Sequence, residues 1–437
     1  MYLERSIDNE LFSWKNGKNR KPLMIRGARQ IGKSSSIRNL GKKFTHFIEV
    51  NFDENSQFGK IFNDINSIEE ICIQIEVITK IPIIEGKTLL FLDEIQVSVE
   101  AIKSLRYFYE KMPNLHIIAA GSLLEFALAE LPSFGVGRVR SIFMYSFSFE
   151  EFLKANNEEI LVKAIQNASV SKPLSSVFHE ISIQYYRKFL IIGGMPEAIK
   201  TYIETQSLLS VQIILDDLIS TFQIDFAKYK SKFDSGSILQ VFRAVILQIG
   251  NKFSYSYPNS TLKNEKIKEI LELLRMAGLV YPITHSACNG IPLGAEINTK
   301  SRKMLIFDTG IFQRLLGLDL SDLLLSTDFE MINKGNIAEL HVGLELLKNK
   351  FMYQSPELFY WQREARGSQA EVDYVIQLNE KIVPVEVKSG KKGSMQSLYL
   401  FLKEKEFPYG IRVSLENFSE IENIKIFPLY AVQNIQK

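Results

Sequence analysis

The stretch GARQIGKS at residues 27–34 constrains this chain more than any other feature of its sequence. It fits the spacing G-x-x-x-x-G-K-[ST] at every fixed position, between the strand-like run PLMIRG and the helix-like run SSSIRNLGKKF. Gly27 and Gly32 allow the backbone to wrap an anion with its N–H groups, and the helix that starts near Lys33 directs its positive dipole end toward that anion. We therefore expect a phosphate-binding loop between a buried strand and a helix.

This loop predicts a nucleoside triphosphate site with a divalent ion. Lys33 would reach the β- and γ-phosphates, and Ser34 would supply a hydroxyl to Mg²⁺. ATP and Mg²⁺ are therefore the expected cofactors. The residues expected to contact the nucleotide are Gly27, Ala28, Arg29, Gln30, Ile31, Gly32, Lys33, Ser34 and Ser35.

Two further strand-like runs end in polar residues. TLLFLDE ends in Asp93, placed to hold Mg²⁺ through water, and Glu94, placed to polarise an attacking water, which indicates an ATPase rather than a passive nucleotide holder. LHIIAAGS ends at Ser122, whose hydroxyl is expected beside the γ-phosphate because parallel sheets bind ligands at the carboxyl ends of their strands. The alternatives are solvated acids and an ordinary serine at strand ends.

The segment GVGRVR then supplies two arginines, Arg138 and Arg140. One of them is a candidate arginine finger, with Arg138 our first choice, acting on its own subunit's nucleotide or on that of a neighbour in a homo-oligomer. A surface or structural arginine is the alternative.

The order of strand-like and helix-like runs predicts the architecture. Short apolar strands alternate with amphipathic helices in the first third, which indicates an α/β protein with a parallel P-loop NTPase sheet. The next part is mostly helical, and the helices SILQVFRAVILQIG and TLKNEKIKEILELLRMAG, followed by two strands, resemble a winged-helix unit, a fold that binds DNA or serves as a packing module. We expect a lead segment at 1–19, an ATPase domain at 20–155, a helical region at 156–235, a winged-helix-like domain at 236–330, and a C-terminal α/β domain at 331–437.

The stretch AEVDYVIQLNEKIVPVEVKSG at 370–390 places an acid and an E-x-K motif on consecutive strands. Strand alternation puts Glu386 and Lys388 on one face, and Asp373 on the preceding strand is close enough to share a metal, with Glu371 as a substitute. The carboxylates of Asp373 and Glu386 would hold a second divalent metal, Mg²⁺ or Mn²⁺, and Lys388 would orient a water. Plain salt bridges between strands are the alternative.

A fourth residue of this candidate nuclease site is Glu339 in NIAELHVGLELLKN. This helix is apolar on two sides and is therefore expected to be buried, so a carboxylate on it needs a metal or Lys388 as its partner. The basic loop KSGKKG at 388–393 would offer phosphate contacts beside the site.

Several of these segments resemble a known family. IRGARQIGKSS, LLFLDEIQ, AAGSLLE and GRVRSIFMYSFSFEEFL are similar to the AAA-type P-loop ATPases of bacteria and archaea, whose core is joined to a C-terminal domain of uncharacterised function. YYRKFLIIGGMPEAI, LLRMAGLVYPI, MLIFDTGIFQRLLG and EVDYVI…PVEVKSG resemble that C-terminal domain, so the resemblance spans most of the chain.

The resemblance implies ATP and Mg²⁺ binding at the glycines, lysine and serine of the loop and at the acids that follow TLLFL, with Ser122 as the first sensor. It also implies a restriction-endonuclease-like fold at the C-terminus. Ser34 stands where threonine is more usual in relatives, and because both hydroxyls bind Mg²⁺ this puts little in doubt.

Composition limits the partners. The 437 residues are 46% apolar and 23% charged with a net charge of +2, so any DNA contact must rest on a local patch. No apolar run reaches the ~18 residues of a membrane span, and the N-terminus is too polar for a signal peptide, so we expect a cytoplasmic protein without membrane contact. Cys72 and Cys288 are expected as buried thiols, the five histidines as structural residues, and Trp361 as core packing rather than a base-stacking platform.

The sequence thus predicts an ATPase that couples its nucleotide state to a nuclease-like C-terminal domain with DNA as a candidate partner. Two alternatives stay open. The first is an ATP-gated, metal-dependent DNA nuclease. The second is a nucleotide-dependent switch or scaffold that binds a protein partner and cleaves nothing.

Overall fold

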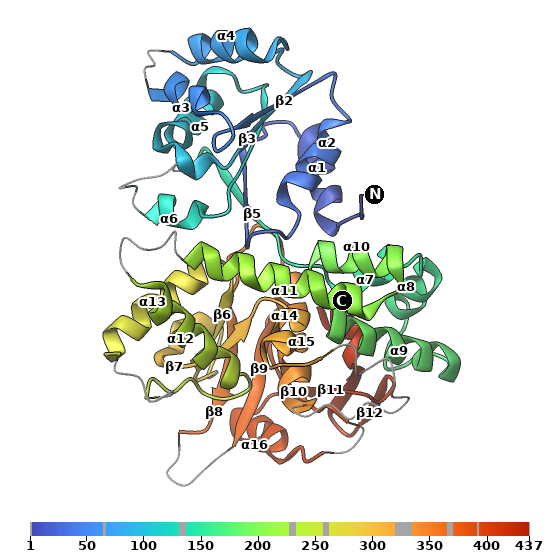
Figure 1. Ribbon diagram of the computed structural model, residues 1–437. Coiled ribbons are helices and arrows are strands. Elements are labelled where there is room, and N and C mark those ends of the chain that lie inside the picture. Colours follow the sequence, from blue (N-terminus) through green and yellow to red (C-terminus); the bar gives the residue numbers. More distant parts are fainter. Residues whose placement is uncertain are drawn as a thin grey trace. The chain divides into compact units, whose positions relative to one another are not determined.

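The computed structural model describes residues 2–63, 67–129, 131, 137–226, 233–256, 262–319, 334–364, 370–390 and 393–436 (Figure 1). Its contacts divide the chain into two compact units. The first unit comprises Met1–Tyr145, Met276–Gly278 and Phe351–Ser355, and the second comprises Ser146–Arg275, Leu279–Lys350 and Pro356–Lys437. Among the described residues, none of the helices combines the length and the apolar character that crossing a membrane requires.

The first unit is built on a parallel sheet with the strand order β2-β3-β4-β1-β5. Its strands are β1 (Leu23–Arg26), β2 (His46–Asn51), β3 (Thr88–Asp93), β4 (His116–Ala120) and β5 (Arg140–Phe143). Its helices are α1 (Ser6–Asn16), α2 (Lys33–Gly41), α3 (Ser56–Asn63), α4 (Ile68–Thr79), η1 (Ile95–Val97), α5 (Val99–Lys111) and α6 (Leu124–Ala129). This parallel α/β sheet confirms the expected P-loop NTPase fold.

The central strands of this sheet are buried throughout and mostly apolar, because helices cover them. Every residue of β3 and β4 is buried, and Ile75, Leu105 and Phe108 from the helices join their core. Cys72 lies in the same core as a buried free thiol, as expected. Since β4 pairs with both β1 and β3 in parallel, the carboxyl ends of the three strands lie at one edge of the sheet.

The second unit begins with helices and ends in a mixed sheet. Its helices are α7 (Phe149–Ala155), α8 (Glu159–Gln166), α9 (Ser176–Ile192), α10 (Pro196–Thr205), α11 (Leu208–Asp225), α12 (Ser235–Leu247), α13 (Asn264–Met276), η3 (Leu293–Glu296), α14 (Thr309–Leu315), α15 (Lys334–Lys348), α16 (Gln396–Lys405) and η5 (Leu429–Gln436). Its strands are β6 (Val280–Ser286), β7 (Ile297–Ile306), β8 (Leu358–Gln362), β9 (Glu371–Leu378), β10 (Lys381–Val387), β11 (Gly410–Ser414), β12 (Ser419–Ile421) and β13 (Ile424–Pro428).

The mixed sheet has the strand order β12-β13-β11-β10-β9-β8-β6-β7. The two helices and the hairpin expected for a winged-helix unit are α12, α13, β6 and β7. The hairpin is not a free-standing wing, however, because β6 pairs in parallel with β8, Ile283 opposite Leu358. Strands from either side of residue 330 therefore share one sheet. Helix α12 ends at Leu247, three residues before Gly250.

Trp361 on β8 is buried and packs edge-on against Phe401 of α16, with ring centroids 5.0 Å apart. This confirms the expected core role. Cys288 is a buried free thiol in the same hydrophobic cluster.

The turn GGMP between α9 and α10 is locked to the start of α14 by one buried carboxylate. Asp308 caps α14 by accepting hydrogen bonds from the backbone N–H of Gly310 at 2.9 Å and of Ile311 at 3.1 Å. Its other oxygen accepts from the N–H of Gly194 at 2.6 Å. Gly193 has φ +78°, and a Cβ there would lie 2.2 Å from Asp308 Oδ1, so this position requires glycine.

Candidate functional site

The phosphate-binding loop lies between β1 and α2, as expected, and both of its glycines are needed. Gly27 has φ +138°, and a Cβ on it would lie 2.1 Å from the carbonyl oxygen of Met144. Gly32, the N-cap of α2, has φ +96°. Side chains would strain the backbone at both positions, so the loop keeps its N–H groups in the open turn that an anion requires.

Lys33 is buried at the first position of α2, and its ammonium contacts the loop itself. Its Nζ donates hydrogen bonds to the carbonyl oxygens of Gly27 at 2.9 Å and Ala28 at 2.6 Å. Burial lowers the pKa of Lys33 to about 8, although the carboxylates of Glu94 and Asp93 oppose the shift. The cation is thus held where a phosphate in the loop would offer it stronger acceptors.

Asp93, the last residue of β3, meets the serine of the loop. The hydroxyl of Ser34 donates a hydrogen bond to Asp93 Oδ2 at 3.0 Å. Burial raises the pKa of Asp93, and the hydrogen bonds from Ser34 and from the N–H of Glu94 oppose that shift. A hydroxyl and a carboxylate oxygen are ligands that Mg²⁺ prefers, so these two residues fit the expected ion.

Glu94 follows β3 with a left-handed backbone, φ +50° and ψ +40°. Its Oε2 accepts hydrogen bonds from Ser122 Oγ at 2.8 Å, from the N–H of Ser122 at 3.2 Å, and from Gln96 Nε2 at 2.6 Å. Burial alone would raise the pKa of Glu94, but the bonds from Gln96 and Ser122 outweigh it and lower that pKa. Glu94 is therefore an ionised carboxylate at neutral pH, as a base that orients water must be.

Gln96 is a site residue that the sequence reasoning missed. Its side chain packs against Gly121, where a Cβ would lie 1.9 Å from Gln96 Oε1 and the glutamine would have to move away. The only signal in the sequence is an amide two residues after the second acid.

The other loop residues occupy different surroundings. Ala28 and Ile31 are buried, and the carbonyl of Ile31 accepts a hydrogen bond from Arg5 Nη1 at 2.9 Å. Gln30 has φ +60°, and the charge of Arg29 contributes to lowering the pKa of Glu94. Ser35 is exposed.

Arg138 lies on the surface in an ion pair with Glu110 of α5, with Nε 3.0 Å from Oε1. Arg140 packs over the ring of Tyr353, with its guanidinium carbon 5.3 Å from the ring centroid. These contacts do not involve the phosphate-binding loop. The arginine finger stays a prediction.

In the second unit, three of the residues expected at the nuclease-like site meet at the ends of β9 and β10. The N–H of Val387 donates to Asp373 Oδ2 at 2.8 Å, and Lys388 Nζ lies 2.7 Å from Glu386 Oε1. Glu386 Oε2 is buried and has no hydrogen-bond partner among the described residues.

The fourth residue, Glu339 of α15, has a partner that the sequence reasoning did not identify. Lys303 of β7 extends its Nζ to 2.9 Å from Glu339 Oε1, 2.5 Å from Glu371 Oε1 and 3.8 Å from Asp373 Oδ1. We call the set Lys303, Glu339, Glu371, Asp373, Glu386 and Lys388 the acid cluster. The signal in the sequence was a lysine at the head of the apolar run KMLIF, whose other residues are buried in the structure.

Burial and neighbouring charges shift the pKa values of the acid cluster in opposite directions. Burial opposes the ammonium of Lys303, but the carboxylates around it, Glu339 first, outweigh burial and raise its pKa. Burial raises the pKa of Glu339 to about 8 against the opposing charge of Lys303. Burial, aided by Asp373, raises the pKa of Glu386 to about 7. The cluster therefore contains a lysine that stays charged, and burial raises the pKa of the two carboxyls of Glu339 and Glu386 against its charge.

The donors of the acid cluster do not fit a resident divalent metal. The ammonium of Lys303 lies among the carboxylates that such a metal would need. Among the described residues, no group of three or more His, Cys, Asp and Glu side chains is arranged to hold a metal ion. Lys391 and Lys392 of the expected basic loop lie outside the described residues.

Comparison with known proteins gives a family match for most of the first unit. Residues 19–153 match the family described as AAA domain. This segment is therefore similar to AAA domains, and we refer to it as the AAA domain. Residues 183–322 and 334–432 match two domains of unknown function, DUF8612 and DUF4143. Because neither description names an activity or a fold, the restriction-endonuclease-like fold remains a prediction.

Solved structures share only a distant likeness with the chain. The Aeropyrum pernix ORC1 protein in complex with DNA is 12% identical, covering 73% of this chain and 92% of that chain, with a TM-score of 0.27. The S. cerevisiae Hsp104–ADP complex is 15% identical, covering 63% and 39%, with a TM-score of 0.29. Among the curated proteins, none matches. At these TM-scores we draw no conclusion about ligands from the neighbours.

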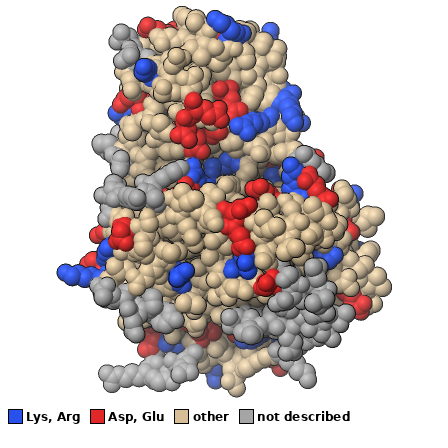
Figure 2. Space-filling view, in the orientation of Figure 1, with Lys and Arg blue, Asp and Glu red and all other residues tan. Residues whose placement is uncertain are grey.

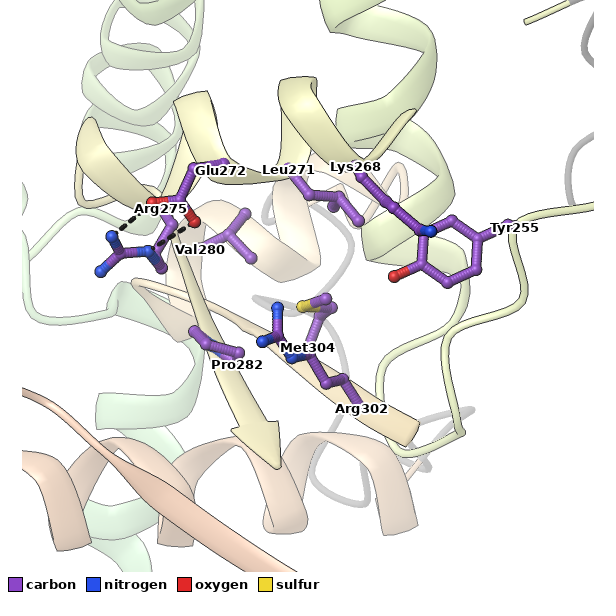
Figure 3. A pocket seen from close by; sticks show the side chains of 9 residues that line it. All are labelled: Tyr255, Lys268, Leu271, Glu272, Arg275, Val280, Pro282, Arg302 and Met304. Carbon is purple, nitrogen blue, oxygen red and sulfur yellow. Dashed lines mark hydrogen bonds and ion pairs between the residues drawn. The ribbon is translucent and has the colours of Figure 1, made fainter. Parts of the chain in front are cut away.

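The second unit also has a pocket, which lies between α13 and the β6–β7 hairpin (Figure 3). It is a small pocket with a cavity volume of about 40 Å³, open to solvent on one side. Arg275 is paired with Glu272, Nε to Oε2 at 2.9 Å, while Lys268 lies over the ring of Tyr255 at 5.7 Å. Figure 3 shows Arg302 reaching from β7 into the space beneath α13. Arg302 and Lys268 are therefore candidate contacts for an anionic group.

Proposed function

We propose that this protein is an ATP-driven switch, in which hydrolysis in the AAA-type domain changes the state of a C-terminal unit that does not itself cleave. The observation that carries the hydrolysis is the carboxylate of Glu94, held by Ser122 and Gln96 beside the Ser34–Asp93 pair. A carboxylate that is oriented and ionised at this place is suited to activating water.

Each residue has a distinct role in this proposal. Mg²⁺, when bound, supplies positive charge to the phosphates, and Ser34 and Asp93 would hold it. Lys33 would exchange its bonds to the carbonyls of the loop for bonds to phosphate oxygens. Glu94 would orient the attacking water and accept its proton, while Ser122 keeps the carboxylate in place.

The test of hydrolysis is ATP turnover by the purified protein and two variants. Lys33→Ala removes the phosphate contact, and Glu94→Gln keeps the shape but removes the base. Both are expected to lose turnover, by on the order of a hundredfold or more for Glu94→Gln. Turnover that persists in both variants would rule this site out.

Two short segments support the coupling. Residues 276–278 and 351–355 belong to the first unit although their flanking elements belong to the second. Gly278 has φ +72° and lies so close to the loop that a Cβ on it would be 2.9 Å from the nitrogen of Ala28. The N–H of Phe143 donates to the carbonyl of Met352 at 2.8 Å. Motion of the loop or of β5 would therefore pass along the chain into β6 and β8.

A second candidate is an ATP-gated DNA nuclease. The adjacency of Asp373, Glu386 and Lys388 and the unpartnered Glu386 Oε2 favour it. It predicts DNA cleavage that requires Mg²⁺ or Mn²⁺ and that Lys388→Ala abolishes. DNA that stays intact with both ions excludes it.

A third candidate replaces DNA with a protein partner. Helix α4 exposes the apolar side chains of Ile73 and Val77, each at 59%. Figure 2 shows one face of the molecule, on which acidic and basic side chains lie in separate groups among other residues. This candidate predicts slow turnover and no nucleic-acid binding at physiological salt. Assembly into a homo-oligomer and action in the cytoplasm remain part of the proposal.

A further inference from the structure

We infer that Lys303 is the resident cation of the acid cluster: its ammonium takes the place of a divalent metal and keeps a latent metal site closed. This inference concerns the second unit alone and does not rest on the proposed hydrolysis of ATP. It makes Lys303 the residue that decides whether the nuclease-like arrangement can take a metal.

The position of Lys303 carries the inference. Its side chain is 1% exposed, and its Nζ lies within 3 Å of both Glu339 and Glu371. The ammonium also lies 5.4 Å from the centroid of the Tyr360 ring. A lysine has three N–H donors, and here carboxylate oxygens and an aromatic face surround them. Leaving this place would strand a charge in the interior, so the lysine is a permanent member of the cluster.

The charge of Lys303 opposes a second cation. A divalent ion bound by Glu339 and Asp373 would lie a few ångströms from the ammonium, where like charges in a buried place repel strongly. The contacts with Lys303 also explain why carboxylates lie in this buried place. A buried ammonium must be paired, and Glu339 and Glu371 are its counter-ions. The carboxylates therefore have a role in the fold that needs no metal.

Removing the charge of Lys303 should open the site. Lys303→Met keeps an unbranched side chain of similar length and leaves the carboxylates of Glu339, Glu371 and Asp373 without their cation. Buried carboxylates without a counter-ion either take up protons or bind a metal through their oxygens. We therefore expect the variant to bind a divalent ion that the wild type excludes.

The experiment is a Mn²⁺ titration of the full chain without nucleotide, followed by electron paramagnetic resonance. The proteins are the wild type, Lys303→Met, Lys303→Met/Asp373→Asn, and the matched control Lys300→Met, which removes an exposed lysine from the same strand. The AAA domain is the same in all four, so its contribution cancels. We expect Lys303→Met to bind Mn²⁺ roughly tenfold or more tightly than the wild type. The double variant should lose that gain, and Lys300→Met should match the wild type.

Two results would overturn the inference. One is a Lys303→Met protein that is folded by circular dichroism and gains no Mn²⁺ site. The other needs no change at Lys303: Asp373→Asn alone is expected to leave wild-type Mn²⁺ binding unchanged. If that variant loses an ion that the wild type holds, metal and lysine share the cluster and the inference is wrong. This second comparison decides the matter even where Lys303→Met does not fold.

Discussion

At the residue scale, the chemistry of the AAA domain depends on how one carboxylate is held. Glu94 has a strained left-handed backbone and three hydrogen-bond donors on a single oxygen, two of them from Ser122. Strain of this kind persists only where the surroundings impose it, and it is common where geometry serves a reaction. We therefore propose that Ser122 acts as a positioning residue for Glu94.

Ser122→Ala tests that role. The change removes the 2.8 Å bond to Glu94 Oε2 and leaves the bond from the backbone of residue 122. Because the carboxylate then loses orientation and part of its support for the ionised form, ATP turnover should fall by about tenfold, less than in Glu94→Gln. The pH at which turnover is half-maximal should rise. Ser13→Ala, at an exposed serine of α1, is the matched control and should keep wild-type turnover.

A buried histidine gives a pH-dependent prediction. Burial, with help from Lys348, lowers the pKa of His341 from 6.5 to about 3, while its Nε2 contacts the carbonyl of Leu429 at 3.0 Å. Between those two pKa values the unfolded chain binds a proton that the folded chain does not. Stability from this group is therefore lost as the pH falls below about 6.5, by up to about 1.4 kcal/mol per pH unit.

Urea unfolding at pH 7, 6 and 5 measures this effect in the wild type and in His341→Gln. The variant cannot take up the proton in either state, so its free energy of unfolding should fall less steeply with acid. Equal slopes for the two proteins would show that His341 does not contribute.

At the element scale, the start of α14 depends on Asp308. The carboxylate caps the helix and holds the GGMP turn, and it is 1% exposed. Asp308→Ala leaves buried N–H groups without an acceptor. The free energy of unfolding should fall by about 2 kcal/mol or more. Asp234→Ala, at the exposed N-cap of α12, is the comparison and should lower the free energy of unfolding by less than Asp308→Ala does. Equal losses in urea unfolding would contradict a special role for Asp308.

Periodicity predicted most of the elements, because strands such as TLLFLD and helices such as α5 carry their burial pattern in a local run of residues. It did not predict that β6 pairs with β8, since the two strands are far apart in the chain and pairing leaves no local signal. The winged-helix interpretation stays a prediction, because a helix pair and a hairpin look the same in sequence whether or not the hairpin extends a larger sheet.

The sequence likewise predicted the contacts of one candidate site and missed a residue of the other. The contacts of Ser34 with Asp93 and of Glu94 with Ser122 follow from spacing, since strand ends in a parallel sheet meet at one edge. Lys303 was not predicted, because it lies 36 residues before Glu339 and the motif for such sites specifies only acids and a lysine nearby in sequence. Only the folded sheet brings β7 to α15.

At the scale of the whole molecule, we propose that binding of nucleotide changes the state of the segments 276–278 and 351–355. Amide hydrogen exchange should slow in both when ATP is added to Glu94→Gln, which binds ATP but does not hydrolyse it. Lys33→Ala with ATP is the control and should show no change. Protection limited to the loop itself, with both segments unaffected, would separate the ATPase from the C-terminal unit and contradict the coupling.

Our main proposal is that this protein is an ATPase joined to a nuclease-like unit that does not cleave DNA. The most direct measurement is ATP turnover by the wild type and Glu94→Gln with supercoiled DNA, Mg²⁺ and Mn²⁺ in the same tubes, with the DNA then examined on a gel. We predict ATP turnover by the wild type, loss of turnover in Glu94→Gln, and intact DNA in every sample. DNA cut by the wild type but not by Lys388→Ala, or turnover that survives in Glu94→Gln, would contradict it.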